Sequence, residues 1–188
     1  IGSHQRTVGR SQVHITPRPI LDALGPFDLD PCAADPRPWD CARVNYNAAD
    51  DGLRRPWPGG WRVWLNPPFD TRGIGTWIAR MAAHGCGTLL VHARTETKWF
   101  QPIWESAAGI LFLAGRVVFC KPDGSPQTVS NPDSKHFGKV ANSGAPVALV
   151  AFGVADARIL AGCGLPGKYL WLGVHAVSSR DLTTGLHA

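Results

Sequence analysis

Hydrophobic residues form short runs and helical stripes along the chain, with polar and turn-forming residues between them. Apolar runs bounded by Gly, Pro, Asp or Asn predict strands, which cover residues 27–30, 61–65, 88–92, 109–113, 116–120 and 146–152, with an edge strand at 169–174. Apolar residues at helical spacing predict helices, which cover residues 16–25, 74–84, 95–105 and 155–161. This alternation is typical of an α/β fold, so we expect a mostly parallel sheet with helices on both faces.

Local signals add detail to this pattern. Thr16 is suited to cap the first helix, Pro17 to occupy its first helical position, and Gly25 to end it. Residues 32–60 lack periodicity, which predicts loops with at most one short element. Residues 121–144 are polar, and a long loop of this kind in a compact domain is usually functional or mobile.

The length of 188 residues predicts one domain, and 44% hydrophobic with 18% charged residues is typical of a soluble globular protein. Because no run of 18 apolar residues occurs and no signal peptide is evident, neither a membrane span nor secretion is expected. Residues 1–4 resemble a cloning remnant and are excluded from the interpretation. The cysteines form no Cys-x-x-Cys pair, which predicts a reduced, cytoplasmic protein without a structural metal; they are Cys32, Cys41, Cys86, Cys120 and Cys163.

The most distinctive chemistry lies in Asn66-Pro67-Pro68-Phe69, the Asn-Pro-Pro-Phe turn, which follows the predicted strand 61–65. Two consecutive prolines fix φ and remove two N–H donors, so the turn presents carbonyl oxygens, an amide oxygen and an aromatic face. Two oxygens can accept both hydrogens of an exocyclic amine while Phe69 stacks on the ring that carries it. An amine held in this way is drawn towards sp³ geometry, which frees its lone pair for attack. The alternative is an ordinary turn, since Asn and Pro are common turn residues.

Polar groups follow three of the predicted parallel strands. They are Asp30-Pro31, the Asn-Pro-Pro-Phe turn and Arg94-Thr95. In an open α/β sheet, ligands bind at the carboxyl ends of the strands. We therefore expect these three groups to meet at one ligand-binding edge of the sheet.

Taken together and in this order, several motifs resemble the phage DNA N-6-adenine methyltransferase family, within the S-adenosylmethionine-dependent amino-methyltransferases. The resemblance covers roughly residues 16–153, and its motifs are Thr16-Pro17, Phe27-Asp28-Leu29-Asp30-Pro31-Cys32-Ala33, Asp50-Asp51-Gly52-Leu53, Trp64-Leu65-Asn66-Pro67-Pro68-Phe69, Ala93-Arg94-Thr95-Glu96-Thr97-Lys98-Trp99-Phe100 and Gly115-Arg116-Val117-Val118-Phe119. It implies a Rossmann-like methyltransferase domain over residues 16–163 that methylates adenine N6 in double-stranded DNA. It also implies S-adenosylmethionine as the cofactor, and the cytoplasm of a bacterial host or prophage-carrying cell as the location.

The resemblance also implies roles for single residues, with Asn66, Pro67, Pro68 and Phe69 as the catalytic turn. Thr16 and Pro17 resemble the motif that holds the methionine carboxylate of the donor. Asp30-Pro31-Cys32-Ala33 resembles the acidic strand end that lies beside the donor's methionine moiety.

Asp50 and Asp51 are the third candidate donor-binding group. One of them is expected to bind the ribose hydroxyls or the adenine amine of the donor, or else both lie in a solvated turn. The chain departs from many such enzymes because no Gly-x-Gly loop follows the first strand. Only about 30 residues separate Asp30 from Trp61, so we expect a trimmed donor-binding half.

DNA contacts are assigned to basic residues at strand ends and in the loop, namely Arg94, Arg116, Lys121, Lys135 and Lys139. The formal net charge of +5 and the pI near 9.2 are compatible with a polyanionic partner. Residues 121–144 are the candidate DNA-recognition loop and residues 1–15 a basic N-terminal arm, whereas residues 164–188 form a tail without an assigned role. Arg94 could equally be a solvated residue near a helix cap.

Three other functions stay open at this level. Cytosine-N4 methylation requires an amine with the same two hydrogens, and glutamine methylation of proteins also uses an Asn-Pro-Pro-aromatic motif. The third is nucleic-acid binding without catalysis. The sequence indicates neither the recognition site nor the oligomeric state.

Overall fold

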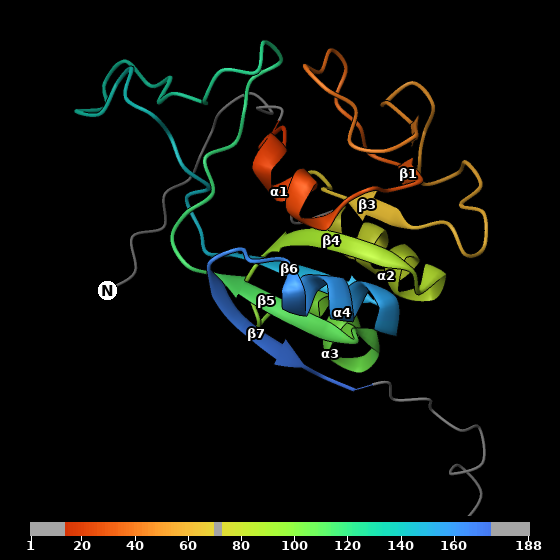
Figure 1. Ribbon diagram of the computed structural model, residues 1–188. Helices are drawn as coiled ribbons and strands as arrows, with labels where there is room; N and C mark the ends of the chain where they lie inside the picture. The colour runs from red at the N-terminus through yellow and green to blue at the C-terminus, as the bar shows by residue number, and fades with distance from the viewer. Residues whose placement is uncertain (1–13, 70–72, 174–188) are drawn as a thin grey trace, which may run out of the picture.

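The computed structural model describes residues 14–69 and 73–173. Within these residues a seven-stranded sheet has the order β2-β1-β3-β4-β6-β5-β7 (Figure 1). Its strands are β1 Leu29–Asp30, β2 Val44–Asn45, β3 Val63–Leu65, β4 Gly87–His92, β5 Gly109–Leu113, β6 Val147–Phe152 and β7 Gly167–Trp171. The predicted basic arm lies outside the described residues except for its last two positions, and so does the tail beyond residue 173.

The sheet has a parallel half and an antiparallel half. Strands β2, β1, β3 and β4 are parallel neighbours, whereas β6 runs antiparallel between β4 and β5 and β7 runs antiparallel beside β5. The α/β class is confirmed, and the prediction of a mostly parallel sheet holds only in part. The physical reason is the long connection between β5 and β6, which brings the chain back into the sheet in the opposite direction.

Helices cover both faces of the sheet, as predicted, and they are α1 Arg18–Leu24, α2 Ile74–His84, the short 3-10 helix η1 Lys98–Phe100, α3 Gln101–Ser106 and α4 Val154–Gly162. One hydrophobic cluster joins α1 and α4 to the sheet, and a second joins α2 and α3 to its other face. Along β6 successive side chains alternate between the clusters, with Leu149 in the first and Val150 in the second. The sheet is therefore buried from both sides.

Three predicted elements differ in the structure. Helix α1 begins at Arg18 with Pro17 at the N-cap, and no side chain caps it, so Thr16 is not its cap. The helix predicted at 95–105 starts only at Lys98, as η1. The strand predicted at 116–120 is absent from the described sheet, because its neighbour is the N-terminal segment, which it meets only through a bridge between Cys120 and Ile15.

The expected meeting of three strand ends is confirmed. Strands β1, β3 and β4 are parallel neighbours, so Asp30, Asn66 and the residues after His92 leave the sheet at the same edge. Two long irregular excursions, residues 31–62 and 114–146, rise on either side of α1 near this edge (Figure 1). The fold thus places the predicted polar groups together.

A buried ion pair fastens the opposite end of the parallel strands. The Arg62 Nε atom donates to the Asp156 carboxylate at 2.7 Å, and the Thr88 hydroxyl donates to the same oxygen at 3.2 Å. Only 1% of the Asp156 side chain and 15% of the Arg62 side chain are exposed. Arg62 also donates to the Pro26 carbonyl oxygen. This cluster ties α4, β4 and the residue before β3 into one unit.

We expect Asp156→Ala to lower the free energy of unfolding by about 3–5 kcal/mol, because it leaves a buried guanidinium without its counter-ion. The measurement is urea unfolding of the variant and the parent. Asp22→Ala is the matched control, because it breaks the exposed Arg18–Asp22 pair at 2.7 Å and should cost at most about 1 kcal/mol. Equal losses in the two variants would contradict a stabilising role for the buried pair.

Candidate active site

The side-chain amide of Asn66 is fixed in orientation by the segment before α1. Its Nδ2 atom donates to the His14 carbonyl oxygen at 2.7 Å and to the Thr16 hydroxyl oxygen at 3.1 Å. A carbonyl oxygen can only accept, so the amide nitrogen must face His14 and Oδ1 must point away. Asn66 Oδ1 is buried and has no protein hydrogen-bond partner among the described residues. A buried acceptor left unpaired is costly and indicates a place for a donor from a ligand.

Phe69 lies within a group of aromatic rings. It stacks on the His92 ring with centroids 4.0 Å apart and an interplanar angle of 18°. The Phe119 and His14 rings lie 6.0 and 5.9 Å away. His92 thus supports one face of Phe69 and holds the ring beside Asn66.

His92 is held in its neutral form. Burial, together with the positive charges of Arg94 and Arg116, lowers its pKa to about 4. A hydrogen bond with the Ser143 backbone acts in the opposite direction but is outweighed. The same interactions show that both arginines lie in the electrostatic neighbourhood of His92, which stacks on Phe69 of the Asn-Pro-Pro-Phe turn. Arg94 and Arg116 are both exposed.

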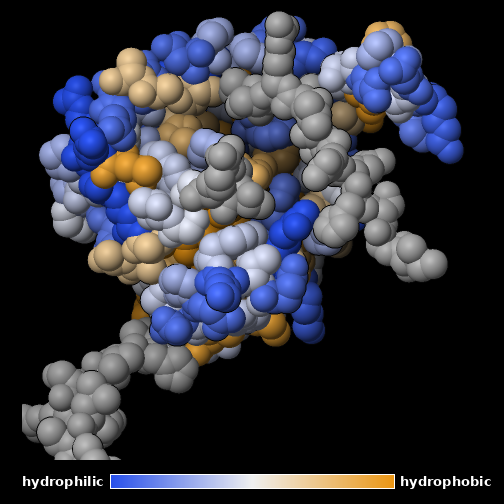
Figure 2. Space-filling model, turned by 180° about the vertical axis from the view of Figure 1, so that it is seen from behind, coloured by the Kyte–Doolittle hydropathy of each residue, from blue (hydrophilic) through white to orange (hydrophobic). Residues whose placement is uncertain are grey.

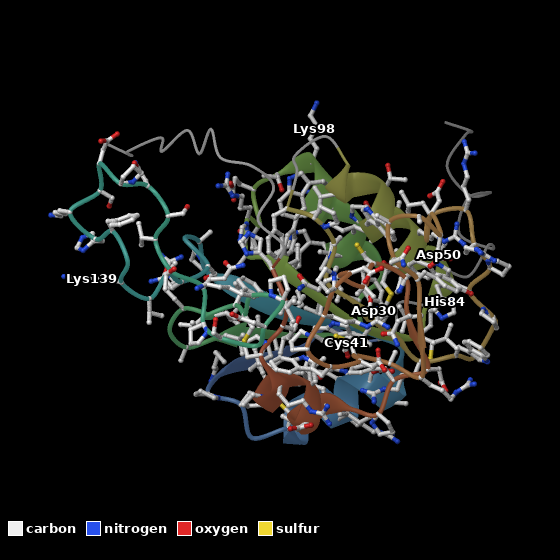
Figure 3. The ribbon with its side chains drawn as sticks, turned by 90° about the horizontal axis from the view of Figure 1, so that it is seen from above. Asp30, Cys41, Asp50, His84, Lys98 and Lys139 are labelled. Carbon is white, nitrogen blue, oxygen red and sulfur yellow. The ribbon has the colours of Figure 1, made fainter. Side chains whose placement is uncertain are left out.

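Asp30, at the end of β1, is a carboxyl group in a desolvated position. Its side chain is 3% exposed, and burial raises its pKa to about 7. The Cys32 backbone N–H donates to Oδ1 at 2.9 Å, and the Cys41 thiol also hydrogen-bonds to the carboxyl group. Figure 3 shows Asp30 and Cys41 as neighbours. Because this carboxyl group is buried, its ionisation near neutral pH lowers the stability of the folded protein.

Cys32 and Ala33, which follow Asp30 in the predicted donor-binding motif, also have defined surroundings. The backbone N–H of Ala33 donates to the Tyr46 carbonyl oxygen at 2.8 Å. Burial and the charge of Asp30 raise the pKa of the Cys32 thiol to about 12, so this thiol stays protonated.

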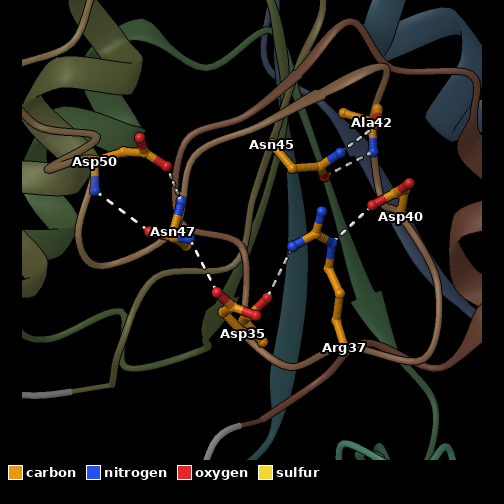
Figure 4. Close-up of polar contacts among 8 residues, drawn as sticks. Asp35, Arg37, Asp40, Ala42, Asn45, Asn47 and Asp50 are labelled. Carbon is orange, nitrogen blue, oxygen red and sulfur yellow. Dashed lines mark hydrogen bonds and ion pairs between the residues drawn. The ribbon is translucent and has the colours of Figure 1, made fainter.

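Asp50 and Asp51 lie in a tight turn beside this strand end. An Asp50 oxygen accepts the Asn47 backbone N–H at 2.9 Å, within the polar network of Figure 4. Asp51 has φ of +53° and pairs with exposed Arg54 at 3.3 Å. The turn packs on β1 through Gly52, where an added Cβ would lie 1.8 Å from the Pro31 carbonyl oxygen. Both carboxylates therefore have roles in the turn, and neither is distinguished as the donor ligand.

The basic residues predicted to contact DNA fall into two groups. Arg94 and Arg116 lie near the Asn-Pro-Pro-Phe turn, whereas Lys139 lies on the arm farther out, away from Asp30 and Asp50 (Figure 3). Lys135 belongs to the same exposed arm, and Lys121 is half-buried near its base. The structure thus brings the arginines, but not the arm lysines, to the sheet edge.

Several residues of the site carry no individual signal in the sequence. His14, His92, Phe119 and Gln127 surround the turn, and the His14 Nδ1 atom lies 3.0 Å from Gln127 Oε1. They come from three segments that are distant in the sequence, because Phe119 and Gln127 both lie in the connection between β5 and β6. Phe119 ends the motif Gly115–Phe119 that contributes to the family resemblance, and His92, the last residue of a predicted strand at the ligand-binding edge, could have been proposed from its position. His14 and Gln127 could not.

The described residues contain no cluster of three or more His, Cys, Asp or Glu side chains suited to a metal ion. In the same parts of the chain, 14–69 and 73–173, no helix is long and apolar enough to cross a membrane.

Polar side chains at the carboxyl ends of adjacent parallel strands define an α/β protein with a ligand site at this sheet edge. A family model of the DNA N-6-adenine-methyltransferase (Dam) family matches residues 8–141. The match covers more than half of the chain, so the protein belongs to this family of DNA methyltransferases. The resemblance inferred from the motifs is confirmed. No curated protein shows a significant match to the chain.

The buried carboxyl group of Asp30 gives a testable pH dependence. Its pKa is about 7 in the folded protein, against an ordinary value of 3.8, so the parent loses stability as the pH rises from about 4 through 7. We expect Asp30→Asn to gain stability relative to the parent over this range, because Asn keeps an acceptor for the Cys32 N–H but does not ionise. Urea unfolding at pH 5, 6, 7 and 8 measures the difference.

Asp123→Asn is the control for this series. Hydrogen bonds from Ser125 lower the pKa of the exposed Asp123 carboxyl below its usual value. It is therefore ionised in the folded and unfolded states throughout this range, and its effect should be flat from pH 5 to 8. A pH-independent effect of Asp30→Asn would show that the carboxyl group is not desolvated.

Proposed function

We propose that the protein methylates N6 of adenine in double-stranded DNA with S-adenosylmethionine as the methyl donor. The observation that carries the proposal is the fixed Asn66 amide, whose buried Oδ1 lacks a partner among the described residues. The ring of Phe69, three residues later, lies 5.9 Å from the ring of the same His14 that holds this amide. The family match supports adenine as the target base. The Asn-Pro-Pro-Phe turn is then the part of the protein that binds the target.

The target base must leave the duplex to reach this turn, because its amine is paired inside the helix. In the proposed complex Phe69 stacks on the flipped base, with His92 as its support on the other face. Asn66 Oδ1 accepts one hydrogen of the amine and a proline carbonyl, that of Pro67, accepts the other. These bonds direct the nitrogen lone pair out of the ring plane.

Two groups at the sheet edge fit the methyl donor in charge and hydrogen bonding. S-adenosylmethionine carries positive charge, which would stabilise the ionised form of the desolvated Asp30 carboxyl group. The Thr16 hydroxyl accepts from Asn66 and still has its own hydrogen to donate to a carboxylate. Thr16 would therefore join the donor's carboxylate to the amide that binds the target.

When bound, S-adenosylmethionine supplies a sulfonium methyl group, so an N–C bond forms with the target amine as the C–S bond breaks. The protein contributes by holding the amine nitrogen in line, at roughly 3–3.5 Å from the reacting carbon. Methyl transfer would leave the nitrogen positively charged and acidic, so its extra proton passes to solvent. Because neither Asn66 nor the proline carbonyl is basic, the turn acts by orientation.

Cytosine-N4 methylation is the second candidate, because its amine presents the same two hydrogens to Asn66 and Pro67. Incubation with labelled donor and mixed-sequence DNA, followed by mass spectrometry of the nucleosides, decides between the two. We expect N6-methyladenine. Label in N4-methylcytosine alone would overturn the assignment of the base, and label only in protein glutamine would overturn DNA as the substrate.

Asn66→Ala should slow single-turnover methylation by about 10²–10³-fold, because it removes an acceptor that acts on the amine in the transition state. Donor affinity should change little. The matched control is Asn45→Ala in β2, which loses the side-chain amide that donates to the Ala42 carbonyl oxygen and should keep the parent rate. Thermal unfolding of the same preparations separates rate from folding. Parent-like turnover by folded Asn66→Ala protein would show that the turn is only structural.

Donor binding should strengthen as the pH rises from 6 to 8 and then level off. The Asp30 pKa of about 7 in the free protein means that binding at lower pH must first expel a proton. Calorimetry in two buffers with different ionisation enthalpies measures both the affinity and the proton release. Asp30→Asn should abolish the release, whereas Asp22→Asn, at an exposed position of α1, should keep it. No heat with S-adenosylmethionine or its demethylated product at millimolar concentration would contradict the proposed cofactor.

A further inference from the structure

Residues 127–141 form a hairpin-like arm, which we call the recognition arm. The Ala141 N–H donates to the Gln127 carbonyl oxygen at 2.7 Å, and the Val129 N–H donates to the Lys139 carbonyl oxygen at 2.9 Å. The Gly138 N–H donates to the Val129 carbonyl oxygen at 3.0 Å. These crossing bonds give the arm a defined shape, although the sequence predicts only a polar loop.

The base of the recognition arm touches the candidate active site. The Gln127 N–H donates to the Phe119 carbonyl oxygen at 2.8 Å, and the Gln127 side chain lies 3.0 Å from His14 Nδ1. His14 in turn holds the Asn66 amide through its carbonyl oxygen. His14 therefore links the arm directly to the Asn66 amide, the group proposed to bind the target amine.

The outer end of the arm presents an aromatic ring among positive charges. The side chain of Phe137 is 59% exposed, in a turn closed by its own N–H to the Ser134 carbonyl oxygen. Lys135, His136 and Lys139 are exposed around it, with Asp133 as the acidic neighbour in the turn. Figure 2 shows the arm from behind as a mostly hydrophilic projection with a few hydrophobic atoms on its surface. An exposed aromatic ring among cationic side chains is an arrangement that suits DNA, because the ring can contact the faces of bases while the cations contact phosphates.

We propose that Phe137 is a wedge that inserts between base pairs of the DNA duplex beside the target base, with Lys135 and Lys139 on the flanking phosphates. This inference rests on the proposed function and adds a contact that opens the duplex. Apolar side chains that enter base steps unstack them and kink the duplex, and an unstacked neighbour lowers the cost of flipping a base.

The reach of the arm fits this role. Phe137 is four positions before Ala141 at the base, which is at most about 13 Å of extended chain at roughly 3.3 Å per residue. Base pairs follow one another at about 3.4 Å, so the ring reaches a step within about four base pairs of the arm's base. Charge complementarity favours DNA over a second copy of this basic protein as the occupant.

The test measures unwinding of a closed circular, mixed-sequence plasmid that is relaxed by a topoisomerase in the presence of saturating protein. An inserted ring unwinds the duplex, so the parent should change the linking number after the protein is removed. We expect Phe137→Ala to reduce this change more than twofold and to slow single-turnover methylation at least tenfold, with an unchanged thermal unfolding midpoint. Phe137→Trp should keep both, because it preserves a flat ring.

Val140→Ala is the matched control, because Val140 is also 59% exposed on the same arm and should unwind DNA like the parent. Lys135→Ala and Lys139→Ala should each reduce the salt dependence of binding by about one slope unit, whereas Phe137→Ala should leave that slope unchanged.

If the parent methylates DNA and Phe137→Ala unwinds it equally well, or alters only the oligomeric state, the wedge is wrong and the proposed function stands. If the parent neither binds nor methylates DNA, the proposed function itself fails.

Discussion

The hydrogen bond from the Asn66 amide to the His14 carbonyl oxygen is the interaction on which the candidate site depends. Reversing the amide would place two oxygens against each other at 2.7 Å, so only one orientation is stable. That orientation leaves a buried acceptor pointing away from the protein's own donors in the described parts of the chain. Two hydrogen-bond acceptors from the segment before α1 thus orient the amide so that its oxygen can accept a hydrogen bond from a ligand at the end of β3. Such preorganisation is useful for orienting an amine, and it brings the folded protein no stability of its own.

The strands that carry this arrangement are short and form few hydrogen bonds, so side-chain packing must hold them in the sheet. Strands β1 and β2 have two residues each, yet Leu29 is fully buried and packs in the cluster that includes α2 and α3. The Arg62–Asp156 pair holds the start of β3 against β4 and α4 from the other end. The β3 and β4 backbones are thus fixed at both ends. His92, the last residue of β4, is therefore held in place by the strand itself and can support the Phe69 ring.

The sequence predicts the parts that depend on local patterns. Helix α2 occupies its predicted residues, 74–84, because a regular apolar stripe ends at Gly85, which adopts φ of +73°. The direction of β6 could not be predicted, since it depends on where the chain returns after a long excursion. The Asn-Pro-Pro-Phe turn is visible because its four residues are consecutive. His14 is not, because tertiary contacts alone bring it beside Asn66.

Asp30 shows how a small donor-binding half can still carry charge. The chain has no Gly-x-Gly loop after β1, and instead the Asp50–Asp51 turn packs on Pro31 at Gly52, which has no space for a side chain. This packing helps remove water from the end of β1, and burial raises the pKa of the Asp30 carboxyl to about 7. A charge that costs stability here gains value only when a cation lies beside it. In the proposed donor site, the loop that replaces the missing strands would therefore favour a positively charged ligand, at the expense of the protein's own stability.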